Sequence, residues 1–229
     1  MRANGWAIFG AMLMLSACGS EAPAPGPSDR PTVIEAEVSG PQIDVLAFGD
    51  SLFAGYGLAD PEQSYPAQLQ QALRTEGRDV RIANAGVSGD TTAAGLQRLA
   101  FTLDSQPVKP DLVLLELGAN DLLRGLPPAQ TRSNLDAMLT ELGKRGIPVV
   151  LMGIQAPPNA GPEFQRTFDA IYPDLAKAHG AKLVPFVGTK VFTEADLLQA
   201  DHVHPTAEGV AELVRVTADA VAAALPPSE

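Results

Sequence analysis

A serine that directly follows a short apolar run is the first residue in this chain that could act as a nucleophile. Residues 43–48 are mostly apolar, which predicts a buried strand, and Gly49-Asp50-Ser51 follows them as a tight turn. In an α/β sheet, the residue after the carboxyl end of a strand faces the crevice where ligands bind. A hydroxyl there becomes a nucleophile only when other parts of the chain supply a base and an oxyanion site.

A candidate base lies near the C-terminus, in the segment Asp201-His202-Val203-His204-Pro205. An aspartate three residues before a histidine in the same loop can fold back and bond the histidine Nδ1. That bond fixes the tautomer and leaves Nε2 free to take a proton from a serine. We assign the base to His204 rather than His202, because His204 has this spacing to Asp201 and precedes Pro205. The proline suits the first turn of a following helix.

Two further segments are able to stabilise an oxyanion. Residues 84–91 form a glycine-rich turn that leads from the second predicted strand into a helix, so backbone N–H groups such as that of Gly89 can face an anion. Gly118-Ala119-Asn120-Asp121 follows the third predicted strand. The side-chain amide of Asn120 can donate a hydrogen bond to a developing oxyanion at that position.

Each of these segments also has an ordinary structural interpretation. Gly-Asp-Ser after a strand is often only a helix cap, and an Asp-x-x-His pair is often a surface loop. We interpret Asp50 as a support of the nucleophile turn, and Asp90 and Asp121 as acids that brace loops. His-x-His could indicate a metal site. However, the chain has three histidines, and the third, His179, is expected at a helix C-terminus, where an imidazole suits the helix dipole. We therefore predict no metal site.

The fold must bring these segments together. Five short apolar runs lack strict alternation, a pattern typical of strands buried on both faces. They are residues 43–48, 80–83, 112–117, 147–152 and 183–184. Helical patterns lie between them, and this alternation predicts a parallel five-stranded, flavodoxin-like sheet in a three-layer αβα sandwich with right-handed crossovers. Every candidate segment follows a predicted strand or precedes the last helix, so all are expected at the same edge of the sheet.

The helices are recognised by apolar side chains with a period near 3.6 residues. These stripes lie within residues 65–73, 96–103, 135–142, 164–175 and 210–221. We assign them to the core and give them no functional role. Pro173 falls inside the fourth stripe and is expected to kink or split that helix.

The four candidate segments, in this order, resemble the SGNH (GDSL-type) hydrolase family, which is named after Ser, Gly, Asn and His in four sequence blocks. The matching residues are Ser51 in Gly-Asp-Ser-Leu, Gly89 in Ser-Gly-Asp-Thr, Asn120 in Gly-Ala-Asn-Asp and His204 in Asp-His-Val-His-Pro. The resemblance covers residues 43–225. Residues 54–57, 88–92, 116–121, 123–125 and 170–173 are similar to the bacterial thioesterase I, lysophospholipase and arylesterase branch. His202 occupies a position that varies in the family.

The resemblance implies a serine hydrolase that cleaves carboxylic esters, and thioesters as well, through an acyl-enzyme and without a cofactor. In this interpretation Ser51, Asp201 and His204 are catalytic. The backbone N–H groups of Ser51 and Gly89 and the amide of Asn120 form the oxyanion hole. Residues 122–128 and 155–162 follow the third and fourth strands, so we expect them to line an acyl groove.

Alternatives from other classes remain open. A carbohydrate acetylesterase would use the same residues, and a non-catalytic lipoprotein could retain the fold as a binding module. An FMN-binding flavodoxin-like protein would share the architecture but leave Ser51 and the pair Asp201 and His204 unexplained. An α/β-hydrolase is disfavoured, because Gly-x-Ser-x-Gly is absent around Ser51 and that fold takes its Asp and His from separate loops.

Composition narrows the range of partners. The 229 residues carry a net charge of −11 and contain no basic run, so nucleic acid is a poor candidate. A single cysteine excludes an internal disulfide. The sequence does not imply an oligomer, and the expected ligand is a small-molecule or lipid acyl ester.

The N-terminal part is expected to direct export. Residues 1–17 carry Arg2 and a short apolar stretch, which together predict a signal peptide. They end in Leu15-Ser16-Ala17-Cys18, which resembles the bacterial lipoprotein box, so we predict a lipidated Cys18. Gly19 rather than aspartate follows, which favours the outer membrane over inner-membrane retention. Residues 18–42 are rich in Pro, Gly, Ser and acids and are predicted to be a disordered tether, followed by the hydrolase domain at 43–229.

Overall fold

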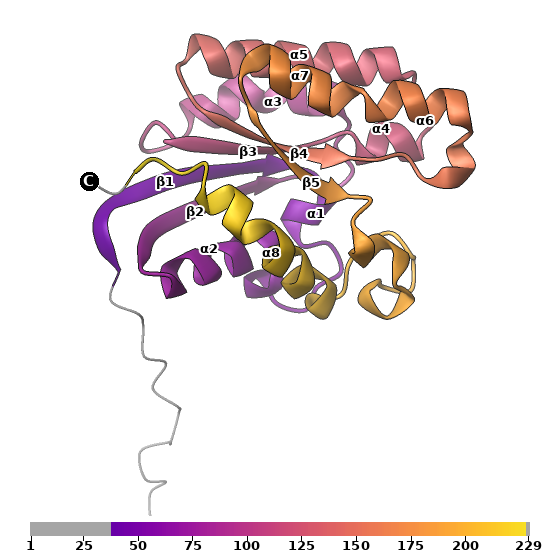
Figure 1. Cartoon of the computed structure of the whole chain (residues 1–229). Coiled ribbons are helices and arrows are strands. Elements are labelled where there is room, and N and C mark those ends of the chain that lie inside the picture. Colours follow the sequence, from indigo (N-terminus) through magenta and orange to yellow (C-terminus); the bar gives the residue numbers. More distant parts are fainter. Residues whose placement is uncertain (1–37, 228–229) are drawn as a thin grey trace, which may run out of the picture. The chain divides into compact units, whose positions relative to one another are not determined.

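The computed structural model describes residues 38–227. The predicted signal peptide, Cys18 and most of the predicted tether lie outside this range. A five-stranded parallel sheet forms the centre, with the strand order β2-β1-β3-β4-β5 (Figure 1). The strands are β1 (Ser39–Gly49), β2 (Arg78–Gly86), β3 (Leu112–Glu116), β4 (Val149–Ile154) and β5 (Lys182–Val187). Each contains or overlaps one of the five predicted runs, so the predicted flavodoxin-like sheet is confirmed.

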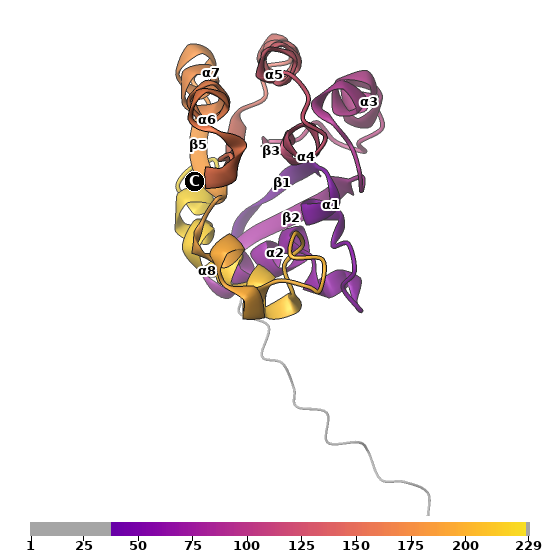
Figure 2. The same cartoon turned by 90° about the vertical axis from the view of Figure 1, so that its right-hand side faces the viewer.

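Helices cover both faces of the sheet. They are α1 (Ser51–Ala54), α2 (Tyr65–Thr75), α3 (Thr92–Asp104), α4 (Ala119–Leu123), α5 (Pro128–Lys144), α6 (Pro162–Asp169), α7 (Ile171–His179) and α8 (Ala207–Ala222). Seen along the sheet in Figure 2, α3, α5 and α7 lie on one face and α2 and α8 on the other. This arrangement confirms the three-layer αβα sandwich. None of the helices between residues 38 and 227 is long and apolar enough to cross a membrane.

Alternating side chains of the strands supply the two halves of the core. In β1, Val45 and Ala47 join the cluster packed against α2 and α8, whereas Leu46 and Phe48 join the cluster packed against α3, α5 and α7. Because successive side chains of a strand point to opposite faces, a strand with apolar residues at every position is buried on both sides. In the second predicted stripe, Leu96, Leu99 and Leu103 are buried or half-buried, whereas Ala100 is exposed.

The start of β1 corrects one prediction. The strand begins at Ser39, so residues 39–42 belong to the sheet and not to the tether, and the domain starts before residue 43. Gly40 has a φ of 90° at an irregularity in the pairing with β2. β1 pairs with β3 only from Val45 onward, so this early segment has one free edge. Pro41 is tolerated there because no neighbouring strand needs a hydrogen bond from it.

Two prolines lie differently from their predicted positions. The predicted split of the fourth helical stripe occurs at Ala170, between α6 and α7, and Pro173 is the third residue of α7. A proline is tolerated in a first helical turn, where its missing N–H would have had no helical acceptor. Pro205 lies before α8 and not in its first turn. Thr206 caps that helix by accepting the Gly209 N–H at 3.1 Å.

Candidate active site

Ser51 lies where β1 ends and α1 begins. The strand stops at Gly49, Asp50 caps the short helix by accepting the Leu52 N–H at 3.1 Å, and Ser51 is the first helical residue. Its side chain is largely buried, with 9% of the residue surface exposed. The turn therefore presents the hydroxyl at the carboxyl edge of the sheet, as predicted.

The structure brings Ser51, His204 and Asp201 into one hydrogen-bonded chain. His204 Nε2 lies 2.9 Å from Ser51 Oγ, and His204 Nδ1 lies 2.7 Å from Asp201 Oδ2. His204 and Asp201 both come from the loop before α8, as their three-residue spacing predicts. The arrangement allows a proton to pass from the serine hydroxyl to the imidazole.

The loop that carries Asp201 holds its carboxylate in the charged form. Asp201 Oδ1 accepts the backbone N–H groups of Val203 and His204, both at 3.0 Å. Partial burial would raise the pKa of Asp201, but the hydrogen bonds from the His204 ring and from these backbone groups lower it to about 2. An ionised Asp201 can only accept, so His204 Nδ1 carries the proton and Nε2 faces Ser51 with its lone pair.

His202 lies next to this chain but outside it. In the described part of the chain, its imidazole makes no hydrogen bond to Ser51 or Asp201, and its backbone has a φ of 57°. The preference for His204 as the base therefore agrees with the geometry.

Sequence reasoning missed two residues that lie beside His204, namely Tyr56 and Gln199. The Tyr56 ring lies 4.6 Å from the His204 ring between centroids, and Gln199 Nε2 donates to the Tyr56 carbonyl at 2.8 Å.

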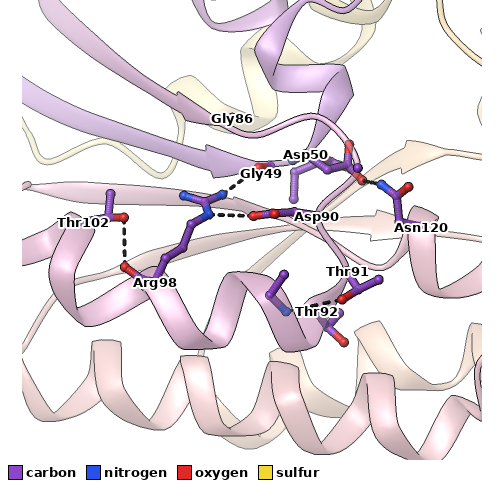
Figure 3. A network of polar contacts seen from close by, with 12 residues as sticks. Gly49, Asp50, Gly86, Asp90, Thr91, Thr92, Arg98, Thr102 and Asn120 are labelled. Carbon is purple, nitrogen blue, oxygen red and sulfur yellow. Dashed lines mark hydrogen bonds and ion pairs between the residues drawn. The ribbon is translucent and has the colours of Figure 1, made fainter.

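Asn120 lies in α4, directly after β3, and points toward the nucleophile turn (Figure 3). Its Nδ2 donates to Asp50 Oδ2 at 3.0 Å, which leaves the second amide hydrogen free for a ligand. We interpreted Asp50 only as a support of the turn. The structure shows that Asp50 supports the turn through Leu52 and in addition holds the Asn120 amide.

Gly89 lies in a turn that follows β2 and is attached to the nucleophile strand. The Val87 N–H donates to the Gly49 carbonyl at 3.0 Å, and the Asp90 N–H donates to the Val87 carbonyl at 3.1 Å. Gly89 has a φ of 86°, which favours glycine. Within residues 38–227, the backbone N–H groups of Ser51 and Gly89 have no acceptor. Both are therefore available to an anion.

Arg98 fastens this turn to the nucleophile strand, a role that sequence reasoning missed. From α3 its guanidinium donates to the Gly49 carbonyl at 2.9 Å and to Asp90 Oδ2 at 2.6 Å (Figure 3). It also lies 3.9 Å from the centroid of the Phe48 ring. In the sequence, Arg98 stands out only as a basic residue between the apolar positions of the predicted helix.

The two other acids are loop braces, as predicted. Asp90 forms an ion pair with Arg98. Asp121 is buried and accepts the Thr92 N–H at 2.8 Å, the Thr92 hydroxyl at 2.5 Å and the Thr131 hydroxyl at 3.2 Å. These bonds join α4 to the starts of α3 and α5.

A cavity of about 510 Å³ opens beside Ser51. Both predicted groove segments contribute to it, since Leu122 and Leu123 come from the first and Ala156 from the second. Phe192 was not predicted. It lines the cavity from the short helix Lys190–Thr193, which follows β5. Asn120 and His204 face the same space, whereas Gly89 is not among the described residues that line it.

The third histidine lies in another part of the domain. His179 is in the last turn of α7, as predicted, and its Nε2 lies 2.7 Å from Asp136 Oδ1. Between residues 38 and 227, no three His, Cys, Asp or Glu side chains are grouped closely enough to hold a metal ion.

Comparison with known proteins assigns the family. Residues 47–211 match the family model of the GDSL-like lipase/acylhydrolases. The chain belongs to this family. It is 44% identical over 173 residues to an arylesterase of Vibrio mimicus, covering 74% of this chain and 85% of the relative. It is 37% identical over 161 residues to thioesterase 1/protease 1/lysophospholipase L1 of Escherichia coli K12, and this match covers 70% of this chain and 74% of the relative.

A solved structure of a family member agrees with the fold. The SGNH-hydrolase family esterase AlinE4 is 62% identical, with a TM-score of 0.69, and the match covers 82% of this chain and 100% of that protein. The GDSL-like hydrolase described here is therefore a serine hydrolase that cleaves esters.

Proposed function

We propose that Ser51 is the nucleophile of this hydrolase, His204 its general base and acid, and Asp201 the group that orients His204. The observation that supports these roles is the continuous hydrogen-bonded chain from Asp201 through His204 to Ser51, with distances of 2.7 and 2.9 Å. A serine is activated when a base lies within hydrogen-bonding distance of its hydroxyl and a third group orients that base, and both contacts are present here.

The reaction proceeds through an acyl-enzyme. Ser51 Oγ attacks the carbonyl carbon while His204 Nε2 takes the hydroxyl proton, and the imidazolium then protonates the departing alcohol. Water, deprotonated by His204, attacks the acyl-enzyme, and Ser51 regains its proton as the acid leaves. The N–H groups of Ser51 and Gly89 and the amide of Asn120 receive the negative charge of each tetrahedral intermediate.

The substrate we propose is an ester with an apolar acyl chain, including lysophospholipids, with thioesters as a second leaving-group class. The apolar side chains of Leu122, Leu123, Ala156 and Phe192 in the cavity support this choice. The names of the relatives point in the same direction, since they include an arylesterase and a thioesterase/lysophospholipase.

We further propose that the protein is exported and anchored to the bacterial outer membrane through a lipidated Cys18. Support comes from the segment Leu15-Ser16-Ala17-Cys18 and from the absence of any second cysteine in the sequence. An exported enzyme would not meet cytoplasmic acyl-CoA, which favours esters as natural substrates. Membrane fractionation of the full chain and of Cys18→Ser tests the anchor, and equal membrane retention of the two would contradict it.

A chain-length series tests the substrate. The protein starting after Cys18 is assayed on p-nitrophenyl esters from acetate to palmitate, with Ser51→Ala in parallel. We expect activity that extends beyond acetate and disappears in the variant. Activity on acetate and on acetylated sugars but not on octanoate would instead assign a carbohydrate acetylesterase. No activity on any ester would support a binding module.

A further inference from the structure

A second buried acid, Glu116, lies directly under the nucleophile turn. It is the last residue of β3, where its backbone pairs with Gly49 of β1. Glu116 and Asp50 both have 0% of their surface exposed. Glu116 Oε2 accepts the backbone N–H of Asp50 at 3.1 Å. A Cβ at Gly49 would lie 2.7 Å from Phe53 Cδ2, 2.8 Å from Glu116 Oε2 and 2.9 Å from the Glu116 carbonyl oxygen, so the strand end has no room for a side chain.

The other carboxyl oxygen of Glu116 poses a problem if the group is ionised. Within residues 38–227, Glu116 Oε1 and Thr189 Oγ1 are the two buried side-chain atoms without a hydrogen-bond partner. The Asp50 carboxyl group belongs to the residue whose backbone N–H Glu116 accepts, and the two buried acids are close enough for each to shift the pKa of the other. Two carboxylates cannot bond each other, because neither has a hydrogen to donate. One proton between the two groups removes this conflict.

The surroundings place that proton on Glu116. The Asp50 carboxylate already accepts the Leu52 N–H and the Asn120 amide, and Ser51 Oγ lies 3.5 Å from it. Within residues 38–227, Glu116 accepts a hydrogen bond from one donor, the Asp50 N–H. Burial raises the pKa of both groups, and the nearby charge of Asp50 raises the pKa of Glu116 further, well above its usual range. Asp50 keeps its charge because more donors stabilise it.

We propose that Glu116 is a positioning residue, which in its neutral form donates a hydrogen bond to the Asp50 carboxylate and thereby keeps Asp50 aligned to hold the Asn120 amide. This inference rests on the proposed role of Asn120 in the oxyanion hole. Glu116 itself touches no substrate. It acts through Asp50, whose orientation decides where the free amide hydrogen of Asn120 points.

The neutral state of Glu116 also matters for the charge near the reacting atoms. An oxyanion develops beside Ser51 and Asn120 during the reaction, and Asp50 already places one negative charge close to it. A second carboxylate charge in this buried region would oppose the oxyanion. With a protonated Glu116, the single charge of Asp50 remains near the reacting atoms.

Glutamine is the variant that separates a neutral donor from a charged carboxylate. In Glu116→Gln, the amide oxygen can accept the Asp50 N–H, and the NH₂ group can donate to the Asp50 carboxylate. We expect its kcat on p-nitrophenyl butyrate to stay close to that of the wild type. Glu116→Leu removes the donor, and misplacement of Asn120 should lower kcat by about 10²-fold with KM little changed.

Infrared spectroscopy tests the protonation state independently of activity. In the difference spectrum of wild type minus Glu116→Gln at pH 7, we expect the C=O band of a protonated carboxylic acid. Glu208→Gln is the matched control, because Glu208 is exposed in the first turn of α8 and its loss should remove a carboxylate band. Circular dichroism and melting curves establish that each variant is folded.

Two results would overturn the proposal. One is a carboxylate band, in place of the carboxylic acid band, in the difference spectrum of wild type minus Glu116→Gln. This measurement can be made even if Glu116→Leu does not fold. The other is a folded Glu116→Gln that loses kcat as strongly as Glu116→Leu, or a folded Glu116→Leu with wild-type kcat. A wrong assignment of Ser51 as the nucleophile would give a different result, because Ser51→Ala would then retain full activity. The infrared band of a protonated Glu116 does not depend on that assignment.

Discussion

At the scale of single residues, the Ser51 hydroxyl has two polar neighbours at different distances. His204 Nε2 lies 2.9 Å from Ser51 Oγ, whereas Asp50 Oδ1 lies 3.5 Å away, at the limit of a hydrogen bond. The shorter contact directs the serine proton to the imidazole. The same Asp50 carboxylate binds the Asn120 amide through its other oxygen. The nucleophile and the oxyanion donor are thus positioned by a common neighbour.

Removal of the Asn120 amide tests the oxyanion donor. Because this donor binds charge that develops only in the transition state, Asn120→Ala should lower kcat by about 10²–10³-fold. KM should change little, and the expected readout is steady-state hydrolysis of a p-nitrophenyl ester. Unchanged turnover in the folded variant would remove Asn120 from the site.

The buried Glu116 also predicts how stability depends on pH. Its pKa is raised in the folded protein, so the folded state binds a proton that the unfolded chain releases near pH 4.5. The stability contributed by that proton is complete below the unfolded pKa and is lost as pH rises toward the folded pKa. The charged or titratable groups facing Glu116 are Asp50 and Tyr172.

Glu116→Gln lacks this titration. As pH rises from 5 to 8, the free energy of unfolding of the wild type should therefore fall relative to that of Glu116→Gln, by at most about 1.4 kcal/mol per pH unit. Urea denaturation of both proteins across this range measures the difference. A difference that stays constant with pH would mean that Glu116 is ionised in the folded protein.

At the scale of secondary-structure elements, the site depends on contacts that join separate segments. Arg98 of α3 connects the end of β1 with the turn that carries Gly89, because it bonds both Gly49 and Asp90. Arg124, at the end of α4, donates to the Gly89 carbonyl at 2.7 Å from the other side. The turn is therefore held by two guanidinium groups from different helices.

Arg98→Ala should loosen this turn. Hydrogen bonds to charged groups contribute about 1.5–3 kcal/mol each, so we expect unfolding to be easier by about 2 kcal/mol, and kcat to fall more than KM changes. Thermal melting and ester kinetics provide the two readouts. Arg98→Lys keeps the charge but cannot form the same forked pair of bonds. Its kcat should therefore lie between that of the wild type and that of Arg98→Ala. Wild-type kcat in folded Arg98→Ala would contradict this role.

The elements also show what a sequence can and cannot predict. The strands and the segments after them were predictable, because apolar runs mark buried strands and the ends of parallel strands meet at one edge. The start of β1 was not, since Gly40 and Pro41 favour an irregular chain and pairing with β2 overrides that preference. The contacts of Arg98 and of Glu116 with Asp50 depend on side chains that meet only after folding. Local sequence patterns carry little information about such contacts.

At the scale of the whole domain, the cavity lies at the edge where the site segments converge. Its lining comes from the segments that follow β1, β3, β4 and β5 and from the loop before α8. A carboxylate placed in this lining should weaken binding of an apolar acyl chain and leave an acetyl group unaffected. Leu123 is suited to this test because it lines the cavity while 61% of its surface is exposed, so its replacement should not disturb the core.

We expect Leu123→Glu to lower kcat/KM for p-nitrophenyl octanoate by about tenfold, which corresponds to the loss of about 1.4 kcal/mol of apolar contact. Its kcat/KM for the acetate ester should stay near the wild-type value. Phe101→Glu is the matched control, since Phe101 is 76% exposed on α3 and does not line the cavity among the described residues. Equal effects on both esters, or the same effect in the control, would argue against an acyl groove at this place.

The central claim is that Ser51 is the nucleophile that His204 activates, and covalent trapping tests it most directly. A p-nitrophenyl alkylphosphonate reacts with such a serine by releasing p-nitrophenolate and leaving a phosphonyl group on the attacking oxygen. Peptide mass spectrometry of the inactivated protein should place this group on Ser51, with no label on the same peptide of Ser51→Ala and slower labelling in His204→Ala. Inactivation with the label on another residue and Ser51 unmodified would contradict the account.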